Sequence, residues 1–441
     1  MIKIEIPDPV NYILKKLSQA GYEAYIVGGC VRDALIGRAP NDWDITTSAL
    51  PMQVKEIFHR TIDTGLQHGT VTVVLREGTF EVTTYRIDGL YEDSRHPSSV
   101  TFTADINEDL RRRDFTINAM AYHPMRGIVD PFDGQGDLAG GVIRAVGCPG
   151  ERFDEDALRI MRAVRFAAQL GFEIEEETLA GVSAFAPRLS LVSHERIRDE
   201  LSKLLSSPHP EMFRLLYESG ITKVILPVFD EMMATVQPSS SHMYNVGEHT
   251  LKVLENIQPP EGYQQAVLAL RLAALLHDMG KPATAGDAFR SHHEIGARMA
   301  ADWMRAFRFD NDIIRQVSLL ILYHDFLMSK DEAGVRTMLN RIGAEMFPLL
   351  MALMRADNMA KSPEARERRL PMIDGLSHMY DEIIARGECY DMRHLAVKGS
   401  DLIAVGVKPG PALGQMLSRM LDDVIKTPSH NTKEFLMREY L

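Results

Sequence analysis

Cysteines and long apolar runs are both scarce in this sequence of 441 residues. Its three cysteines, Cys30, Cys148 and Cys389, show no paired spacing, which excludes a disulfide framework and a zinc site made of cysteines. This usage is typical of a reducing compartment, so we predict a cytoplasmic location. The N-terminus lacks the apolar region of a signal peptide. No uninterrupted apolar run reaches the roughly 20 residues that cross a bilayer, so we predict no membrane association.

Basic residues are also fewer than acidic residues in the chain as a whole. With 49 basic and 61 acidic residues, the formal net charge is −12, which argues against general binding to polyanions and weighs against a nucleic-acid partner. The basic residues are unevenly distributed, however. Residues 111–113 are all arginine, and arginine recurs every three residues at Arg159, Arg162 and Arg165. Such local basic stripes can outweigh an acidic total.

A glycine turn lies between a predicted strand and a predicted short helix near the N-terminus. Residues 22–27 are rich in β-formers, and residues 30–36 have helical spacing of apolar side chains. Gly28 and Gly29 permit a tight turn with no Cβ to obstruct a ligand. A helix start beside such a turn presents free N–H groups and a positive dipole end, which suits phosphate. Arg32, in the first helical turn, can add bidentate phosphate contacts.

Two aspartates share one face of the next predicted strand, residues 41–46. Asp42 and Asp44 are two residues apart, so their side chains point the same way. Such carboxylates, together with substrate phosphates, suit Mg²⁺, and two ions can clamp the attacking and leaving oxygens of a phosphoryl displacement. The competing interpretation is a solvated strand end with two surface aspartates. Glu81, on a strand predicted over residues 80–86, is a candidate third acid or a plain exposed residue.

A charged face is predicted on a helix over residues 154–170. Helical spacing groups on it Glu155, Asp156, Arg159, Arg162 and Arg165. Asp156 only accepts hydrogen bonds and Arg159 only donates them. Cytosine and adenine both place an amine donor beside a ring-nitrogen acceptor, so this pair would accept CTP and ATP and refuse GTP and UTP. Arg162 and Arg165 are candidates for contacts with the base or the triphosphate, and the alternative is a salt-bridged solvent face.

A second polar cluster, Arg113 with Asp114, precedes an apolar stretch. The two side chains are candidates for binding the ribose hydroxyls and so selecting ribonucleotides. An ordinary ion pair at a helix N-terminus is the competing interpretation. Residues 86–105 are polar and rich in turn formers, which predicts a mobile loop.

Histidines and aspartates gather in the middle of the chain, on separate predicted helices. The predicted ligands of a metal site are His249, His277, Asp278, His293, His324 and Asp357. Imidazole and carboxylate together suit a transition metal that activates water for phosphoester hydrolysis. Spacing does not separate His292 from His293, and the tract over residues 293–297 favours His293.

Several of these motifs resemble those of the class II tRNA nucleotidyltransferases, the CCA-adding enzymes of the DNA polymerase β-like superfamily. The histidine-rich block resembles the HD phosphohydrolase superfamily. The segments that carry the first resemblance are a metal and triphosphate motif (28–33 and 41–44), a sugar-recognition motif (112–114), a nucleotide template (155–159), two further motifs (130–134 and 193–197) and a tail (399–402 and 408–414).

The resemblance implies an α+β fold with a small N-terminal sheet domain and helices thereafter. It implies a nucleotidyltransferase head over residues 1–148, a helical neck over 149–206, a helical body over 207–385 with an HD domain at about 245–360, and a tRNA-binding tail over 386–441. It also implies an enzyme that uses Mg²⁺, CTP and ATP to add C, C and A to the 3′ end of tRNA without a nucleic-acid template.

Relatives of this kind differ in product. The segment 86–105 resembles the flexible loop that CC-only members lack, and no basic motif typical of poly(A) members is present, so we predict full CCA addition. The alternatives are an A-adding enzyme or poly(A) polymerase of the same family, an HD phosphohydrolase whose head is a regulatory nucleotide sensor, and a non-catalytic tRNA-binding protein. The HD block also predicts a second activity, of the phosphatase or cyclic phosphodiesterase kind.

Overall fold

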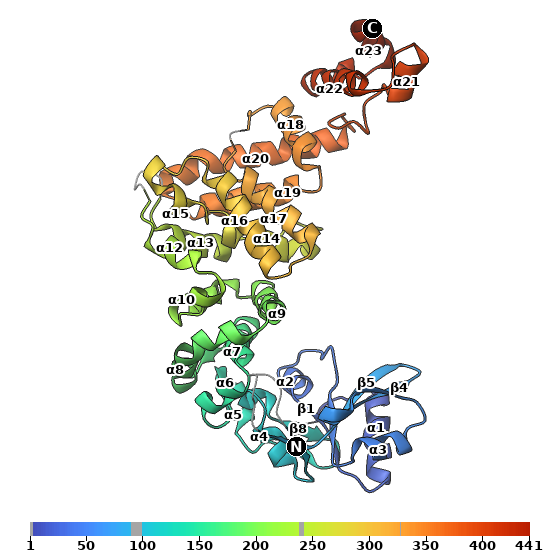
Figure 1. Cartoon of the computed structure of the whole chain (residues 1–441), viewed down its shortest axis with the longest axis vertical. Coiled ribbons are helices and arrows are strands. Elements are labelled where there is room, and N and C mark those ends of the chain that lie inside the picture. Colours follow the sequence, from blue (N-terminus) through green and yellow to red (C-terminus); the bar gives the residue numbers. More distant parts are fainter. Residues whose placement is uncertain (1–2, 90–98, 238–241, 327) are drawn as a thin grey trace. The chain divides into compact units, whose positions relative to one another are not determined.

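A seven-stranded mixed sheet forms the centre of the N-terminal part of the chain (Figure 1). The computed structural model describes residues 3–89, 99–237, 242–326 and 328–441. In the order β3-β4-β5-β2-β1-β8-β9, only β5 and β2 pair in parallel. The strands are β1 Ala24–Val27, β2 Ile45–Thr47, β3 Thr61–Gly65, β4 Thr70–Leu75, β5 Gly78–Thr84, β8 Ala121–His123 and β9 Gly127–Val129.

Apolar side chains on the strands and on the first helix pack into the core of this domain. Ile26, Ile45 and Val82 lie on neighbouring strands and are buried. The apolar stripe of the first helix, α1, is buried. The helices of the head are α1 Asp8–Gln19, α2 Gly29–Leu35, α3 Pro51–Ile57, α4 Ile106–Arg111 and α5 Gly134–Gly140.

Two short strands lie within the segment 86–105, for which we predicted a mobile loop. β6 Arg86–Asp88 pairs in antiparallel fashion with β7 Val100–Phe102. The ends of the 86–105 segment are therefore a hairpin stem rather than irregular loop. Residues 90–98 lie outside the described residues, so the central part of that prediction is untested.

A short strand, β10 Val142–Ile143, pairs with β11 Glu173–Ile174 and lies outside the large sheet. The helix expected over 154–170 is broken at Asp156, whose φ and ψ are −140° and 102°. The Asp156 Oδ1 atom accepts a hydrogen bond from the Leu158 N–H at 3.0 Å, so this aspartate starts a new helix rather than continuing the old one.

The chain divides into two units, residues 1–227 and 228–441. Residues 207–227 group with the first unit, whereas the sequence placed them in the body. The neck is helical apart from β11. The remaining helices of the first unit are α6 Pro149–Glu155, α7 Leu158–Leu170, α8 Glu176–Phe185, α9 His194–Leu205, α10 Phe213–Glu218 and α11 Thr222–Ile225.

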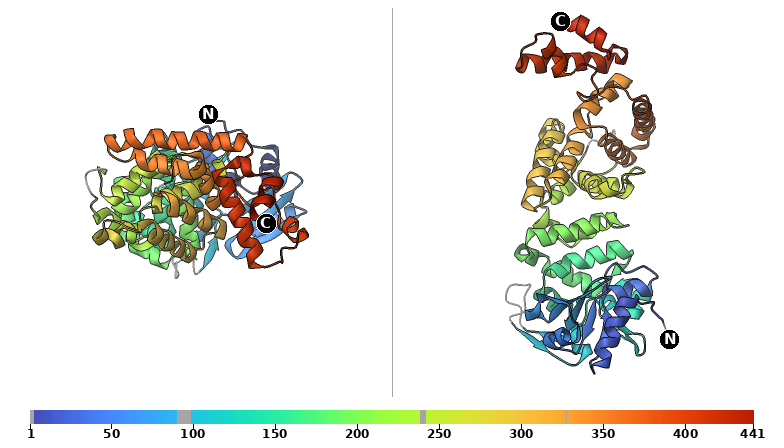
Figure 2. Two further views of the ribbon diagram at one scale, coloured as in Figure 1. Left: turned by 90° about the horizontal axis from the view of Figure 1, so that it is seen from above. Right: turned by 90° about the vertical axis from the view of Figure 1, so that its right-hand side faces the viewer.

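The described residues of the second unit form helices and connecting segments, as the right-hand view of Figure 2 shows, which confirms the predicted α+β class. Among the described residues, no helix combines the length and apolar character that crossing a membrane requires. The helices are α12 Val228–Ala234, α13 Val246–Asn256, α14 Val267–Leu276, α15 Lys281–Thr284, α16 His292–Ala306, α17 Asn311–Tyr323, α18 Glu332–Ile342, α19 Phe347–Met359, α20 Pro363–Ala385, α21 Gly399–Ala404, α22 Pro411–Lys426 and α23 Lys433–Tyr440.

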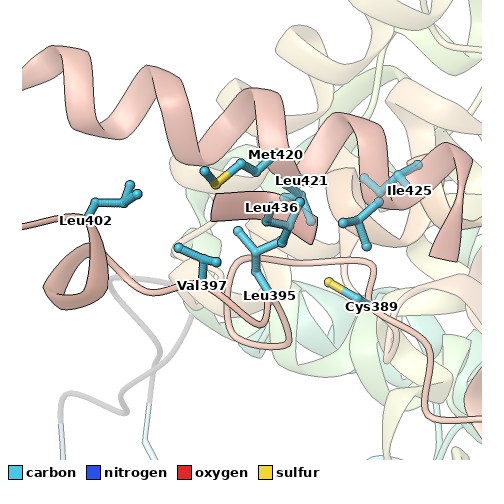
Figure 3. Close-up of a cluster of buried hydrophobic side chains, with 9 residues drawn as sticks. Cys389, Leu395, Val397, Leu402, Met420, Leu421, Ile425 and Leu436 are labelled. Atoms are coloured by element: carbon cyan, nitrogen blue, oxygen red, sulfur yellow. The ribbon is translucent and has the colours of Figure 1, made fainter. Parts of the chain in front are cut away.

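The last three helices share a small apolar core (Figure 3). Its centre includes Leu402, Leu421 and Leu436, one from each helix. A buried arginine of α18, Arg336, links this core to the rest of the second unit. Its Nε donates to the carbonyl of Ile425 at 2.7 Å. Its Nη1 lies 2.6 Å from Glu388 and 3.1 Å from Glu332.

We expect Arg336→Met to loosen the tail, because it removes the buried donor, leaves the Ile425 carbonyl without it and takes one of two arginines from Glu332 and Glu388. The free energy of local opening of α22 should fall by about 2–3 kcal/mol, which amide hydrogen exchange measures. Arg386→Met is the matched control, since Arg386 pairs with the same two glutamates from an exposed position. Equal amide exchange of α22 in the two variants would contradict the role of Arg336 as the link between this core and the rest of the second unit.

Candidate active site

Asp42 and Asp44 lie in the extended segment just before β2, which begins at Ile45 and not at residue 41 as expected. Both side chains are exposed at this edge of the head. The Val27 N–H donates to the Asp44 carbonyl at 3.0 Å, which fixes Asp44 beside the glycine turn. Desolvation by the surrounding protein raises the pKa of Asp44, Arg113 lowers it, and the neighbouring Asp42 carboxylate raises it. This crowding favours a cation between the two carboxylates.

Glu81 belongs to the strand that pairs with β2. The parallel register aligns Ile45 with Val82 and Thr46 with Thr83. One residue earlier, the same register brings Glu81 level with Asp44, and both side chains are exposed. Aligned residues of parallel strands point to the same face, so this placement favours the third-acid interpretation of Glu81 over that of an isolated surface residue.

Gly28 is required at the turn for two reasons. Its φ is +81°, which favours glycine, and a Cβ there would lie 2.9 Å from Nη1 of Arg113. The turn therefore lets the Arg113 guanidinium approach the backbone beside Asp44. The Gly28 N–H donates to the Met120 carbonyl at 3.1 Å, so this particular group is used within the sheet and is not free for phosphate.

Arg32 is buried and makes several contacts within the protein. Its Nε and Nη2 donate to the Asp33 carboxylate at 2.9 and 2.7 Å, and its Nη1 donates to Asn118 Oδ1 at 2.7 Å. It also lies over the Phe166 ring, 5.0 Å from the centroid. These contacts use three of the five N–H donors of the guanidinium, and no contact of the others with phosphate is shown, so the predicted role of Arg32 stays a prediction.

Asp114 is buried where the head meets the neck. Its carboxylate accepts from Nε of Arg162 at 2.7 Å, from the Phe115 N–H at 2.9 Å and from Nδ2 of Asn118 at 3.2 Å. Burial alone would raise the pKa of Asp114, but Arg162 and Arg159 hold it well below its usual range. Asp114 is therefore a fixed negative charge, suited to accept a hydrogen bond from a hydroxyl group.

The two residues of the expected base-reading pair are held by different partners. Asp156 Oδ2 accepts from Nη2 of Arg196 at 2.8 Å. Arg159 lies 2.6 Å from Glu155 and donates to the Arg112 carbonyl at 2.8 Å. Arg196 is a functional candidate that residue-by-residue reasoning missed. Its signal was the motif over residues 193–197, to which we assigned no role.

Arg162 and Arg165 differ from each other in the structure. Arg162 pairs with Asp114, beside the expected sugar site. Arg165 is buried, lies 2.7 Å from Glu200 of α9, and packs over the Phe166 ring. Arg165 therefore holds α7 against α9, and these contacts do not support the contact that we expected between Arg165 and the nucleotide.

The histidine–aspartate cluster forms as a buried centre within the second unit. His249 Nε2 lies 3.0 Å from Asp357 Oδ1, and His277 Nε2 lies 3.1 Å from Asp278 Oδ2. His324 Nε2 lies 3.7 Å from Asp278 Oδ1. Two overlapping groups within the cluster have ligand atoms close enough to share one ion. A cavity of about 670 Å³ opens onto the cluster.

The imidazoles of this cluster are oriented as metal ligands usually are. Nδ1 of His277 and of His324 each lies within 2.8 Å of the carbonyl oxygen three residues earlier. A carbonyl only accepts, so these Nδ1 atoms carry the proton and present an unprotonated Nε2 to the centre. Among the residues that the structure describes, Nε2 of His277 and Oδ1 of Asp278 are buried and have no hydrogen-bond partner. The donor set therefore fits a transition metal.

The preference for His293 is wrong. His292 Nε2 lies 3.4 Å from His324 Nε2 and 3.5 Å from Asp278 Oδ1, whereas His293 is only its neighbour at the cavity wall. The cause is the turn before α16. Ser291 adopts a left-handed conformation and the Phe289 carbonyl accepts from Nδ1 of His292 at 2.9 Å, which directs His292 inward.

Three family models match successive parts of the chain between residues 24 and 365. The family models are the poly A polymerase head domain at residues 24–144, the probable RNA and SrmB-binding site of polymerase A at 171–233, and the HD domain at 240–365. A CCA-adding enzyme of Lactobacillus delbrueckii subsp. bulgaricus is 37% identical over 421 residues, which span 96% of this chain and 94% of the relative.

Solved structures are similar over nearly the full length. The Bacillus stearothermophilus CCA-adding enzyme in complex with CTP matches with a TM-score of 0.71 and 30% identity, covering 98% of each chain. The Thermotoga maritima CCA-adding enzyme complexed with tRNA matches with a TM-score of 0.61 at 21% identity, covering 98% and 95%, and shows the fold alone.

These matches, with the acidic pair beside the glycine turn, define a nucleotidyltransferase that carries an HD domain. The extent and identity of the similarity show more than the class. The chain belongs to the family of CCA-adding enzymes, the tRNA nucleotidyltransferases.

Proposed function

We propose that the protein adds C, C and A to the 3′ end of tRNA, using CTP and ATP and releasing pyrophosphate. The observation that carries the proposal is the position of Asp42 and Asp44 beside the Gly28 turn, in a member of the CCA-adding family. The full-length relatives named CCA-adding enzyme favour this activity over an A-adding, poly(A) or purely regulatory head. The cysteine usage supports work in the cytoplasm.

The head binds and orients the reactants. Asp42 and Asp44, with Glu81 level with Asp44, are the residues that would hold Mg²⁺. When bound there, Mg²⁺ would neutralise phosphate charge and lower the pKa of the attacking 3′-hydroxyl. The Arg113 guanidinium, held beside Gly28 and Asp44, adds positive charge for the triphosphate. Asp114, fixed by Arg162, accepts from a ribose hydroxyl. Positioning and electrostatics then supply most of the rate.

The neck selects the base. Asp156 is held from two sides, by the Leu158 N–H on Oδ1 and by Arg196 on Oδ2. A carboxylate has about four acceptor sites, so capacity remains for an exocyclic amine. Arg159, anchored by Glu155 and the Arg112 carbonyl, supplies donors for a ring nitrogen. The pair thus discriminates CTP and ATP from GTP and UTP without a template strand.

The acidic pair is tested by Asp42→Ala. We expect at least about a hundredfold loss of labelled CTP and ATP incorporation into tRNA lacking its 3′ end, because transition-state charge loses its counterion. The affinity for tRNA, measured by filter binding, should stay unchanged. Asp63→Ala is the control, since Asp63 is an exposed carboxylate of the same domain, paired with Lys55. Retained incorporation in the Asp42 variant would refute the proposal.

The base-selecting role is tested by Arg159→Ala. Without its donors, GTP and UTP should be incorporated at rates closer to those of CTP and ATP, because discrimination by hydrogen bonding is lost. Competition among the four labelled nucleotides measures the ratio. Arg188→Ala, which removes an arginine of the neck that pairs with Asp154, is the control. An unchanged ratio in the Arg159 variant would show that selection lies elsewhere.

We further propose that the HD cluster is a second, metal-dependent phosphoester hydrolase. The observation that favours it is the inward set of imidazoles around the buried Asp278. The residues that would hold the metal are His249, His277, Asp278, His292, His324 and Asp357. The metal would supply an activated water when bound. The basic side chains of the cavity wall, including Arg290 and Arg368, would attract a phosphate group.

The hydrolase is tested by His277→Ala. This change removes a ligand whose Nε2 faces Asp278, so bound manganese or nickel and the hydrolysis of a model phosphomonoester should both fall at least about tenfold. Metal content after dialysis and phosphate release are the measurements. His378→Ala, at an exposed position on α20, is the matched control. Undiminished metal content would contradict the ligand assignment.

A further inference from the structure

Each of the two carboxylates in the HD cluster is held by its own lysine. Lys281 Nζ lies 2.7 Å from Asp278 Oδ2, and Lys361 Nζ lies 2.5 Å from Asp357 Oδ2. All four residues are buried, with exposed fractions of 7% and 8% for the lysines and 1% and 3% for the aspartates. Lys281 follows Asp278 by three residues and Lys361 follows Asp357 by four, so each pair spans about one helical turn, a local signal that our predictions from the sequence did not use.

These contacts balance the charge of the cluster. Two carboxylates face two ammonium groups, so the fixed charges sum to zero before any ion is added. A buried charge is costly unless an opposite charge compensates it. A divalent ion bound among the imidazoles would therefore bring in two positive charges that the protein's own carboxylates do not offset.

The cavity beside the cluster increases this imbalance. Its wall includes Arg290, Arg368 and Arg369 as well as both lysines, and one of these arginines, Arg369, lies 3.6 Å from Asp325. The groups that line the cavity thus carry a net positive charge once a metal is present. The compensating charge has to come from an anion in the cavity, and a tetrahedral phosphate can accept from several of these donors at once.

We propose that the HD cluster binds its metal and a phosphate group cooperatively, with Lys281 and Lys361 offsetting the ligand carboxylates so that the ion is held tightly only together with the anion. This inference rests on the proposed metal site of the HD domain and adds a control on its loading. Because coupling is reciprocal, the metal also tightens the binding of phosphate by the same factor. The site then stays poorly metallated until a phosphorylated ligand is available.

The coupling is measured directly in the full-length protein. A variant with Asp42→Ala and Asp44→Ala silences the head, and the affinity for Mn²⁺ is then determined by electron paramagnetic resonance with and without saturating inorganic phosphate, at constant ionic strength. We expect phosphate to tighten Mn²⁺ binding by at least about fivefold. Mn²⁺ binding that phosphate leaves unchanged overturns the coupling but leaves the metal site standing. No Mn²⁺ binding under either condition overturns both.

Lys361→Met separates the lysine's charge from its bulk. Because Asp357 then loses its paired ammonium, Mn²⁺ alone should bind several-fold more tightly and phosphate should add less to the affinity. Lys361→Arg, which keeps the charge, should retain the coupling of the parent, and thermal unfolding confirms that each variant is folded. Lys252→Met is the matched control, because this lysine of α13 pairs with the exposed Glu255. Full coupling in the Lys361→Met variant would overturn the proposal.

Discussion

Compensation of carboxylate charge is the constraint on which both sites depend. In the head, Asp42 and Asp44 flank one residue, and the backbone bond from Val27 keeps Asp44 beside the glycine turn. Arg113 is a nearby counter-charge that lowers the pKa of Asp44, and the acidic pair is the proposed site for divalent ions and a triphosphate. In the HD cluster the protein instead supplies one lysine for each carboxylate. The same physical problem therefore has two solutions in one chain.

Contacts between the head and the neck connect the residues that we propose for sugar and base recognition. Arg162 of the neck fixes Asp114 of the head, and Arg159 binds the carbonyl of Arg112. Arg196, from the next long helix of the neck, holds Asp156. The groups that would meet ribose and base are thus braced across two elements distant in sequence. Such bracing reduces the freedom that binding would otherwise remove.

Features set by local sequence were predictable, and features set by distant contacts were not. The strand before Gly28, the turn at Gly28 and the acidic pair were each predicted from neighbouring residues, and the structure contains all three. The break at Asp156 escaped the helical pattern, because the side chain's bond to the Leu158 N–H outweighs the periodicity. The choice of His292 over His293 depends on the left-handed Ser291, whereas the two lysines lie three and four residues after their aspartates, a spacing that the sequence does contain.

The central claim is that the acidic pair of the head holds divalent ions against a triphosphate. The most direct test is anomalous diffraction from crystals soaked with manganese and CTP. We expect a manganese peak between the carboxylates of Asp42 and Asp44. The triphosphate should lie beside the Gly28 turn, and the base should face Asp156 and Arg159. Manganese absent from the carboxylate pair, or a nucleotide bound away from the turn, would contradict it.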